Sequence, residues 1–141
     1  MRARMIALAR IVLFGSAIVF VGIGVAFVAA PAGYASVVEI AAPTAVARTE
    51  LRATFGGLEL GFGLFLGLCA IRSGWMIPGL AALGLALGGF AGARLIGMLV
   101  EGTASRLMLI FETLEVATAA LAFYLMHGLS RTRATVDGQP W

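Results

Sequence analysis

Five ionisable residues lie within, or at the ends of, stretches of sequence that are otherwise apolar. They are Arg52, Glu59, Arg94, Glu112 and Glu115. Ionisable groups are costly to place in hydrocarbon, so they usually pair with one another inside a helix bundle. A buried carboxyl group can also act as a general acid or base, and a guanidinium group can bridge two carboxylates. These five residues form the candidate polar cluster, which either binds a ligand or stabilises the fold.

The sequence does not favour metal or covalent chemistry at this cluster. Di-metal helix bundles use Glu-x-x-His pairs, whereas the segment from Glu112 to Glu115 reads Glu-Thr-Leu-Glu. The single histidine, His127, is expected at the opposite membrane face, where it would complement the dipole at the end of its helix. The single cysteine, Cys69, can form neither an internal disulfide nor a Cys/His metal motif. We therefore expect no metal, no cofactor and no catalytic residue.

The composition of the chain indicates that lipid surrounds most of these residues. Of the 141 residues, 61% are hydrophobic and 12% are charged, and the mean hydropathy is +1.02. A soluble domain carries about 25% charged residues, which is twice this density. The net charge of +3 arises from arginines that are scattered along the chain. Scattered charges of this kind do not favour a nucleic-acid partner, and the lipid bilayer is the expected environment.

Four apolar segments are long enough to cross a bilayer, since about 20 helical residues at 1.5 Å per residue span the hydrocarbon core. They cover approximately residues 11–30, 51–71, 75–99 and 106–127. The sequence therefore predicts an all-α fold, an integral membrane antiparallel four-helix bundle. One domain covers residues 1–130, and a polar cytoplasmic tail follows at residues 131–141. The first segment is longer than the apolar part of a signal peptide, so we expect it to be retained.

The connections between these segments carry their own signals. Residues 34–42 are apolar apart from Ser36 and Glu39, and they form either a helix on the membrane surface or a lid over the polar cluster. Thr49 is the expected N-cap of the second segment, because threonine can accept a hydrogen bond from the first helical turn. Gly128 is expected to end the fourth segment.

Arginine is unevenly distributed between the two predicted ends of the bundle. The end that carries both termini holds Arg2, Arg4, Arg10, Arg72, Arg131 and Arg133, and the opposite end holds Arg48, Arg52, Arg94 and Arg106. Basic residues are enriched in cytoplasmic loops, so this difference predicts that both termini are cytoplasmic. The polar cluster then lies in the outer half of the bundle.

The spacing of the charged residues suggests how they pair. Arg52 and Glu59 are seven residues apart, which is nearly two turns of an α-helix, so they are expected to share a face. Glu112 and Glu115 are three residues apart and share a face of the fourth segment. Arg52 and Arg94 are the expected partners of these carboxylates. Three glutamates against two arginines leave one excess negative charge, so one glutamate, Glu59 or Glu112, is expected to carry a proton at neutral pH.

Glycines at four-residue spacing predict close contacts between helices, because glycine lets two backbones approach. The pairs Gly57–Gly61 and Gly88–Gly92, together with Gly56, are the candidate packing positions. The second and third segments are richest in this pattern, so we expect them to form the closest contact. The contact lies either within one chain or between copies of the chain.

Residues 50–61 contain the sequence Arg-Ala-Thr-Phe-Gly-Gly, from Arg52 to Gly57. This stretch resembles the hallmark of a bacterial family of small four-helix membrane proteins that is known only as a domain of unknown function. The resemblance extends over about residues 8–128, and Arg94 and one of Glu112 and Glu115 match further family positions. It implies the four-helix fold and a location in the bacterial cytoplasmic membrane, but it supplies no activity.

Three functions follow from these features. The first is a non-enzymatic membrane protein, either an accessory subunit of a membrane complex or a module that binds a small molecule or lipid at the polar cluster. The second is a small proton-coupled transporter, which would need a homo-oligomer to form a pathway. The third is a membrane enzyme for a lipophilic substrate, with Glu59 or Glu112 as general acid or base. The absence of a catalytic motif favours the first.

Overall fold

The computed structural model describes residues 2–137, and these residues form helices and short connections without any strand. The elements are α1 (Arg2–Ala29), α2 (Pro31–Val37), α3 (Ala45–Leu51), the π-helical segment η1 (Arg52–Gly57), α4 (Leu58–Ile71), the short 3-10 segment η2 (Ser73–Trp75), α5 (Met76–Glu101) and α6 (Arg106–Asp137). Four continuous helical stretches are long and apolar enough to cross a membrane: Ala3–Ala29, Ala45–Ile71, Ser73–Glu101 and Arg106–Arg131. These stretches correspond to the four predicted segments.

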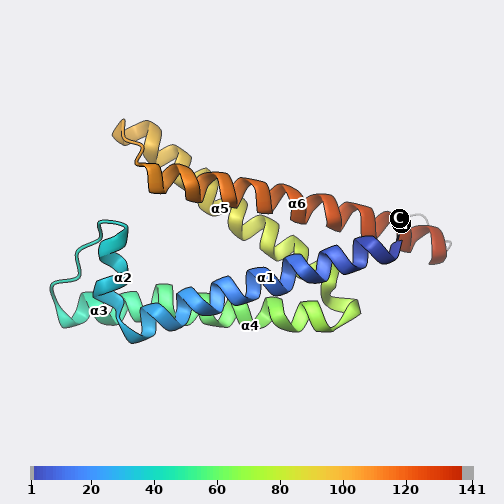
Figure 1. Ribbon diagram of the computed structural model, residues 1–141, viewed down its shortest axis with the longest axis horizontal. Coiled ribbons are helices and arrows are strands. Elements are labelled where there is room, and N and C mark those ends of the chain that lie inside the picture. Colours follow the sequence, from blue (N-terminus) through green and yellow to red (C-terminus); the bar gives the residue numbers. More distant parts are fainter. Residues whose placement is uncertain (1, 138–141) are drawn as a thin grey trace.

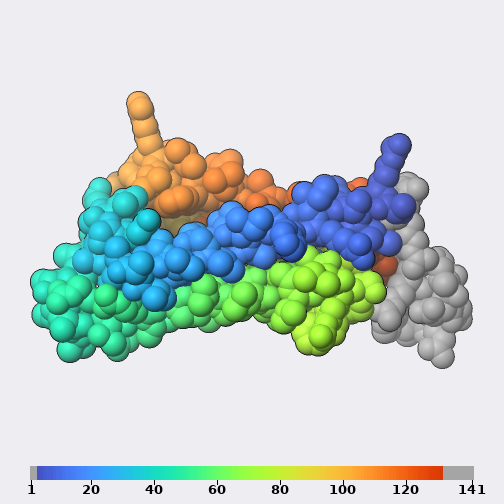
Figure 2. Space-filling model, turned by 60° about the horizontal axis from the view of Figure 1, so that its bottom comes forward, coloured from blue at the N-terminus to red at the C-terminus, as the bar shows by residue number. Residues whose placement is uncertain are grey.

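The long helices form two pairs, α1 with α4 and α5 with α6, as Figure 1 shows. The pairs meet at the end of the molecule where α1 begins and α6 finishes, which we call the terminal end. They diverge toward the opposite end, which we call the distal end (Figure 1). Figure 2 shows α1 lying along α4, with the segment around α2 covering the distal end of this face.

The hydrophobic core is shared by all four long helices and lies toward the terminal end. Its largest fully buried side chains are Leu13, Leu66, Cys69, Leu80, Leu83 and Leu125. Lipid tails are as apolar as leucine, so in a membrane this core would be stabilised mainly by van der Waals packing. The two pairs are therefore joined at the terminal end, and the core does not extend into the distal half.

The closest helix contact is between α1 and α4. A Cβ atom added at Gly24 would lie 2.6 Å from the Leu60 backbone nitrogen, and one added at Gly63 would lie 2.8 Å from the Val21 backbone nitrogen. Only glycine permits backbones to approach this closely. The tightest contact thus joins the first and second spans, whereas the sequence pattern suggested the second and third.

The glycines that the sequence singled out have different surroundings. Gly56 is buried, and a Cβ there would lie 2.8 Å from Cγ2 of Val28. Gly57 faces only the Arg52 carbonyl of its own segment, at 3.8 Å. A Cβ at Gly61, Gly88 or Gly92 would meet nothing within 4 Å. The α5 contacts instead use other glycines, namely Gly79 against Cys69 and Gly84 against the ring of Phe123.

The connections differ in detail from the sequence prediction. The second span begins at Ala45, because Thr44 rather than Thr49 is the N-cap and accepts a hydrogen bond from the Ala47 backbone at 3.1 Å. Residues 31–37 form the short helix α2, and the chain then runs without regular structure to Thr44. The fourth helix continues past Gly128 to Asp137, so the predicted tail begins as helix. Residues 138–141 of that tail lie outside the described residues.

Candidate functional site

Arg94, Glu112 and Glu115 form an ion-pair cluster between α5 and α6. Nη1 of Arg94 donates a hydrogen bond to Oε2 of Glu115 and lies 3.8 Å from Oε2 of Glu112. The guanidinium carbon of Arg94 also lies 5.7 Å from the ring centroid of Phe111. The two carboxylates share a face because they are three residues apart on one helix. This cluster links the distal parts of α5 and α6.

Arg52 lies apart from that cluster and contacts the end of α1. Its Nε donates a hydrogen bond of 3.0 Å to the carbonyl oxygen of Val28, and among the described residues it forms no ion pair. Val28 belongs to the last turn of α1, where carbonyl groups have no partner within the helix. A cation there also complements the helix dipole. Arg52 therefore caps α1, and it does not neutralise the carboxylates as the sequence suggested.

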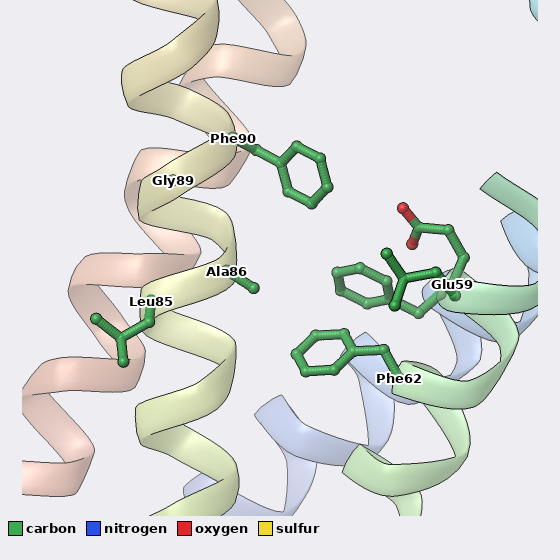
Figure 3. Close-up of a pocket in the computed structure, with 8 residues that line it drawn as sticks. Glu59, Phe62, Leu85, Ala86, Gly89 and Phe90 are labelled. Atoms are coloured by element: carbon green, nitrogen blue, oxygen red, sulfur yellow. The ribbon is translucent and has the colours of Figure 1, made fainter. Parts of the chain in front are cut away.

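The difference arises from the π-helical segment η1. The backbone N–H of Leu58 bonds to the Ala53 carbonyl, an i→i+5 hydrogen bond that is typical of a π-helix. The wider turn changes the angular offset between Arg52 and Glu59 from that of an α-helix, and Arg52 contacts α1 whereas Glu59 reaches into the space between α4 and α5 (Figure 3). The segment comprises the same six residues, from Arg52 to Gly57, as the sequence motif. Its first residue and Gly56 both contact α1 at Val28.

Glu59 lies in the first turn of α4, two residues after η1, and is buried. Only 9% of its surface is exposed, and its Oε2 atom has no hydrogen-bond partner among the described residues. No described cation pairs with it either. Figure 3 shows its carboxyl group reaching from α4 into the space between α4 and α5.

That space is a pocket of about 460 Å³ between the two helix pairs. Its lining comes from α1, α4 and α5 and consists of Phe20, Leu58, Glu59, Phe62, Leu85, Ala86, Gly89 and Phe90. In Figure 3, Phe62 reaches from α4 toward Ala86, and Phe90 reaches back from α5 toward Glu59. Glu59 is the single ionisable residue of the lining, so an otherwise apolar pocket contains one carboxyl group.

The five predicted residues thus fall into three places. Arg94, Glu112 and Glu115 are joined, Glu59 lies in the pocket, and Arg52 caps α1. Glu115 is close enough to Glu59 to act on it as a like charge. The ion-pair cluster and the pocket are therefore neighbours, although no hydrogen bond or ion pair connects them in the described part of the chain.

The aromatic lining was not selected from the sequence. Phe20 and Phe62 pack edge to face, with ring centroids 4.9 Å apart, and Phe90 lies on the opposite wall. Apolar residues are abundant throughout the chain, so their type alone gives no signal. The one local signal was spacing, since Phe62 is three residues after Glu59 and lies on the same helix face.

Residues that could hold a metal ion do not gather in the described part of the chain. Residues 2–137 contain no group of three or more histidine, cysteine, aspartate or glutamate side chains arranged to hold one. Cys69 is buried in the core beside Gly79. His127 is exposed near the terminal end of α6, away from the carboxylates. The site is therefore described by its carboxyl groups, its arginine and its aromatic rings.

Comparison with known proteins extends the sequence resemblance. No curated protein and no solved structure matches the chain significantly. A family model does match, and it covers residues 8–126, which include α4, α5, most of α1 and α6, and every residue of the candidate site. This match confirms the resemblance that the Arg52–Gly57 motif indicated. The chain belongs to the family described as "Domain of unknown function (DUF4345)".

Proposed function

We propose that this protein is an integral membrane protein that binds a small lipophilic molecule between its two helix pairs, with the Glu59 carboxyl group as the polar contact. Four antiparallel spans would carry both termini on the cytoplasmic side of a bacterial inner membrane. The four long apolar helices and the excess of arginine at the terminal end support this topology. The pocket then opens in the outer half of the membrane.

The observation that carries the proposal is the carboxyl group of Glu59. Buried polar groups in proteins are almost always hydrogen-bonded, and leaving one unsatisfied costs about 1–3 kcal/mol. Glu59 is buried without a partner, and it faces a pocket whose volume lies in the range typical of ligand sites. A ligand that supplies a donor or a positive charge would offset this cost.

The rim of the pocket supports entry from lipid. Leu85 is 69% exposed and Phe90 is 41% exposed. In a bilayer these side chains would contact acyl chains, so a lipophilic molecule could move laterally into the pocket without crossing water. The ion pairs of Arg94 would hold α6 against α5, which itself forms one wall of the pocket, and this gives the cluster a structural role.

A photoreactive fatty alcohol provides the test. The full-length protein in phosphatidylcholine nanodiscs is labelled with a diazirine-bearing alcohol, and the labelled peptides are mapped by mass spectrometry. We expect labelling on α4 and α5 at the pocket. Gly89→Leu should reduce it, because Gly89 lines the pocket and a Cβ there would meet nothing within 4 Å, which leaves room for the larger side chain to narrow the pocket.

The matched control is Gly88→Leu. Gly88 also has open space around it but does not line the pocket, so this variant should be labelled like the wild type. Uniform labelling of all lipid-facing helices, with no difference between the two leucine variants, would contradict the proposal. Native mass spectrometry of the same sample tests the accessory-subunit alternative, since a stoichiometric second protein would support it.

A further inference from the structure

The charges around the pocket are unbalanced. Three carboxyl groups, those of Glu59, Glu112 and Glu115, lie in or beside the pocket, and Arg94 pairs with the latter two. Arg94 is already engaged by both α6 carboxylates and by the ring of Phe111. It therefore has little capacity to attract an anion into the pocket.

Arg52 does not correct this imbalance. Its Nε is bonded to the Val28 carbonyl at the end of α1, and it does not line the pocket. No cation of the described residues pairs with Glu59, and Glu115 acts on it as a like charge. Charges interact more strongly in a medium of low dielectric constant than in water. An anionic ligand would be repelled here, whereas a cationic one would be attracted by Glu115 and would pair with Glu59 in its ionised form.

The pocket walls are also suited to a cation. Phe20 and Phe62 form one wall and Phe90 forms the other, and Figure 3 shows the labelled rings on either side of the gap beside the Glu59 carboxyl group. Aromatic faces attract ammonium and guanidinium groups, as Phe111 does for Arg94 within the protein itself. The same rings accommodate an apolar body.

We infer that the ligand of this pocket is a lipophilic organic cation, an ammonium group on an apolar body, whose positive charge lies against Glu59 and whose body lies against the phenylalanine rings. This inference rests on the proposed function and adds the charge of the ligand. It excludes fatty acids and other lipophilic anions as the ligand class.

Three probes that share one apolar skeleton and differ only in the charge of their polar group test the inference. They are 1-adamantylammonium, 1-adamantanol and 1-adamantanecarboxylate, and their binding is measured by equilibrium dialysis against protein-loaded and empty phosphatidylcholine nanodiscs. We expect the ammonium probe to bind the protein most tightly and the carboxylate least. Glu59→Gln should weaken ammonium binding by roughly tenfold or more, as expected for loss of a charged contact.

Two further variants test whether the effect of Glu59→Gln arises from loss of the charge in the pocket. The alternatives are a general loss of negative charge and misfolding of the variant. Glu101→Gln removes an exposed glutamate at the distal end of α5 and should leave ammonium binding unchanged. Glu59→Asp keeps the charge on a shorter side chain and should retain part of the binding. Circular dichroism and gel filtration of each variant verify that the helices and the particle size are unchanged.

The outcomes that overturn the inference are distinct from those that overturn the proposed function. Equal or tighter binding of the carboxylate probe, absence of ammonium binding, or ammonium binding that Glu59→Gln does not weaken would each refute the cation as ligand. Photolabelling of the pocket by the neutral fatty alcohol decides the proposed function separately. Pocket labelling without cation preference would leave a lipophile-binding protein whose ligand is uncharged or anionic.

Discussion

Two glycines on α4, Gly61 and Gly63, provide a direct test of how the helices pack. They are two residues apart, and the spacing of glycines in the sequence does not indicate which of them contacts another helix. A Cβ at Gly63 would lie 2.8 Å from both the backbone nitrogen and Cγ2 of Val21 and 3.0 Å from the Ala17 carbonyl oxygen. A Cβ at Gly61 would meet nothing within 4 Å. Alanine should therefore be less well tolerated at position 63 than at position 61.

The expected difference in stability between the two alanine variants follows from two contributions. Replacing glycine by alanine inside a helix stabilises it by up to about 1 kcal/mol, and this term applies to both variants. Gly63→Ala also forces α1 and α4 apart, and overpacking of this kind costs about 1–3 kcal/mol. The propensity term cancels in the difference, so Gly61→Ala should be more stable than Gly63→Ala by about 1–3 kcal/mol.

Equilibrium unfolding in mixed micelles, with increasing SDS and helix content followed by circular dichroism, measures this difference. The wild type should lie between the variants or close to Gly63→Ala. If Gly61→Ala is the less stable of the two, the contact between α1 and α4 described above is wrong, or the open face of Gly61 is covered by a second copy of the chain. Gel filtration of both variants distinguishes these cases.

Three other predictions concern the charged residues and the topology. Arg94→Gln should lower the free energy of unfolding by about 1–3 kcal/mol, and a double-mutant cycle with Glu115→Gln should show coupling, since the two form one ion pair. Arg52→Leu should accelerate hydrogen exchange of backbone amides at the end of α1 because it removes the cap at Val28, whereas Arg48→Leu should leave that exchange unchanged because Arg48 bonds to Pro43 and Ala42. A reporter that is active only in the cytoplasm should be active when it is fused to the C-terminus. Activity of a reporter that works only after export would instead show that the proposed orientation is reversed.

The four long apolar helices could be predicted from the sequence because length and hydropathy alone determine them. Their limits could not, since Thr44 and Thr49 are equally good N-cap residues and local preference does not choose between them. Thr49 instead bonds back to the Ala45 carbonyl within the helix, at 2.9 Å. The glycine contacts were partly missed for a similar reason. In a glycine-rich chain, spacing identifies a face of a helix but not the helix that covers it.

The site residues were identified from their charge, but their pairing was not. Glu112 and Glu115 lie in a regular α-helix, so their shared face and their contact with Arg94 follow from the spacing. Arg52 and Glu59 are separated by η1, and a π-helical turn leaves no clear sign in the hydrophobic pattern. The aromatic pocket depends on the angle between two helix pairs, which is set by packing in the core rather than by any local pattern.

Because the two helix pairs are joined at the core and diverge from it (Figure 1), the angle between them sets the width of the pocket. The two pairs are joined at the terminal end, near Leu83, and Phe90 lies seven residues farther along α5, roughly 10 Å at 1.5 Å per residue. A rotation of about 6° between the pairs would therefore change the width of the pocket by about 1 Å at this distance. The lining residues can stay in place on their helices while the gap widens or narrows. The angle at the joint would thus govern the size of molecule that the proposed ligand site accepts, and substitutions in the core would alter ligand selection without touching the ligand.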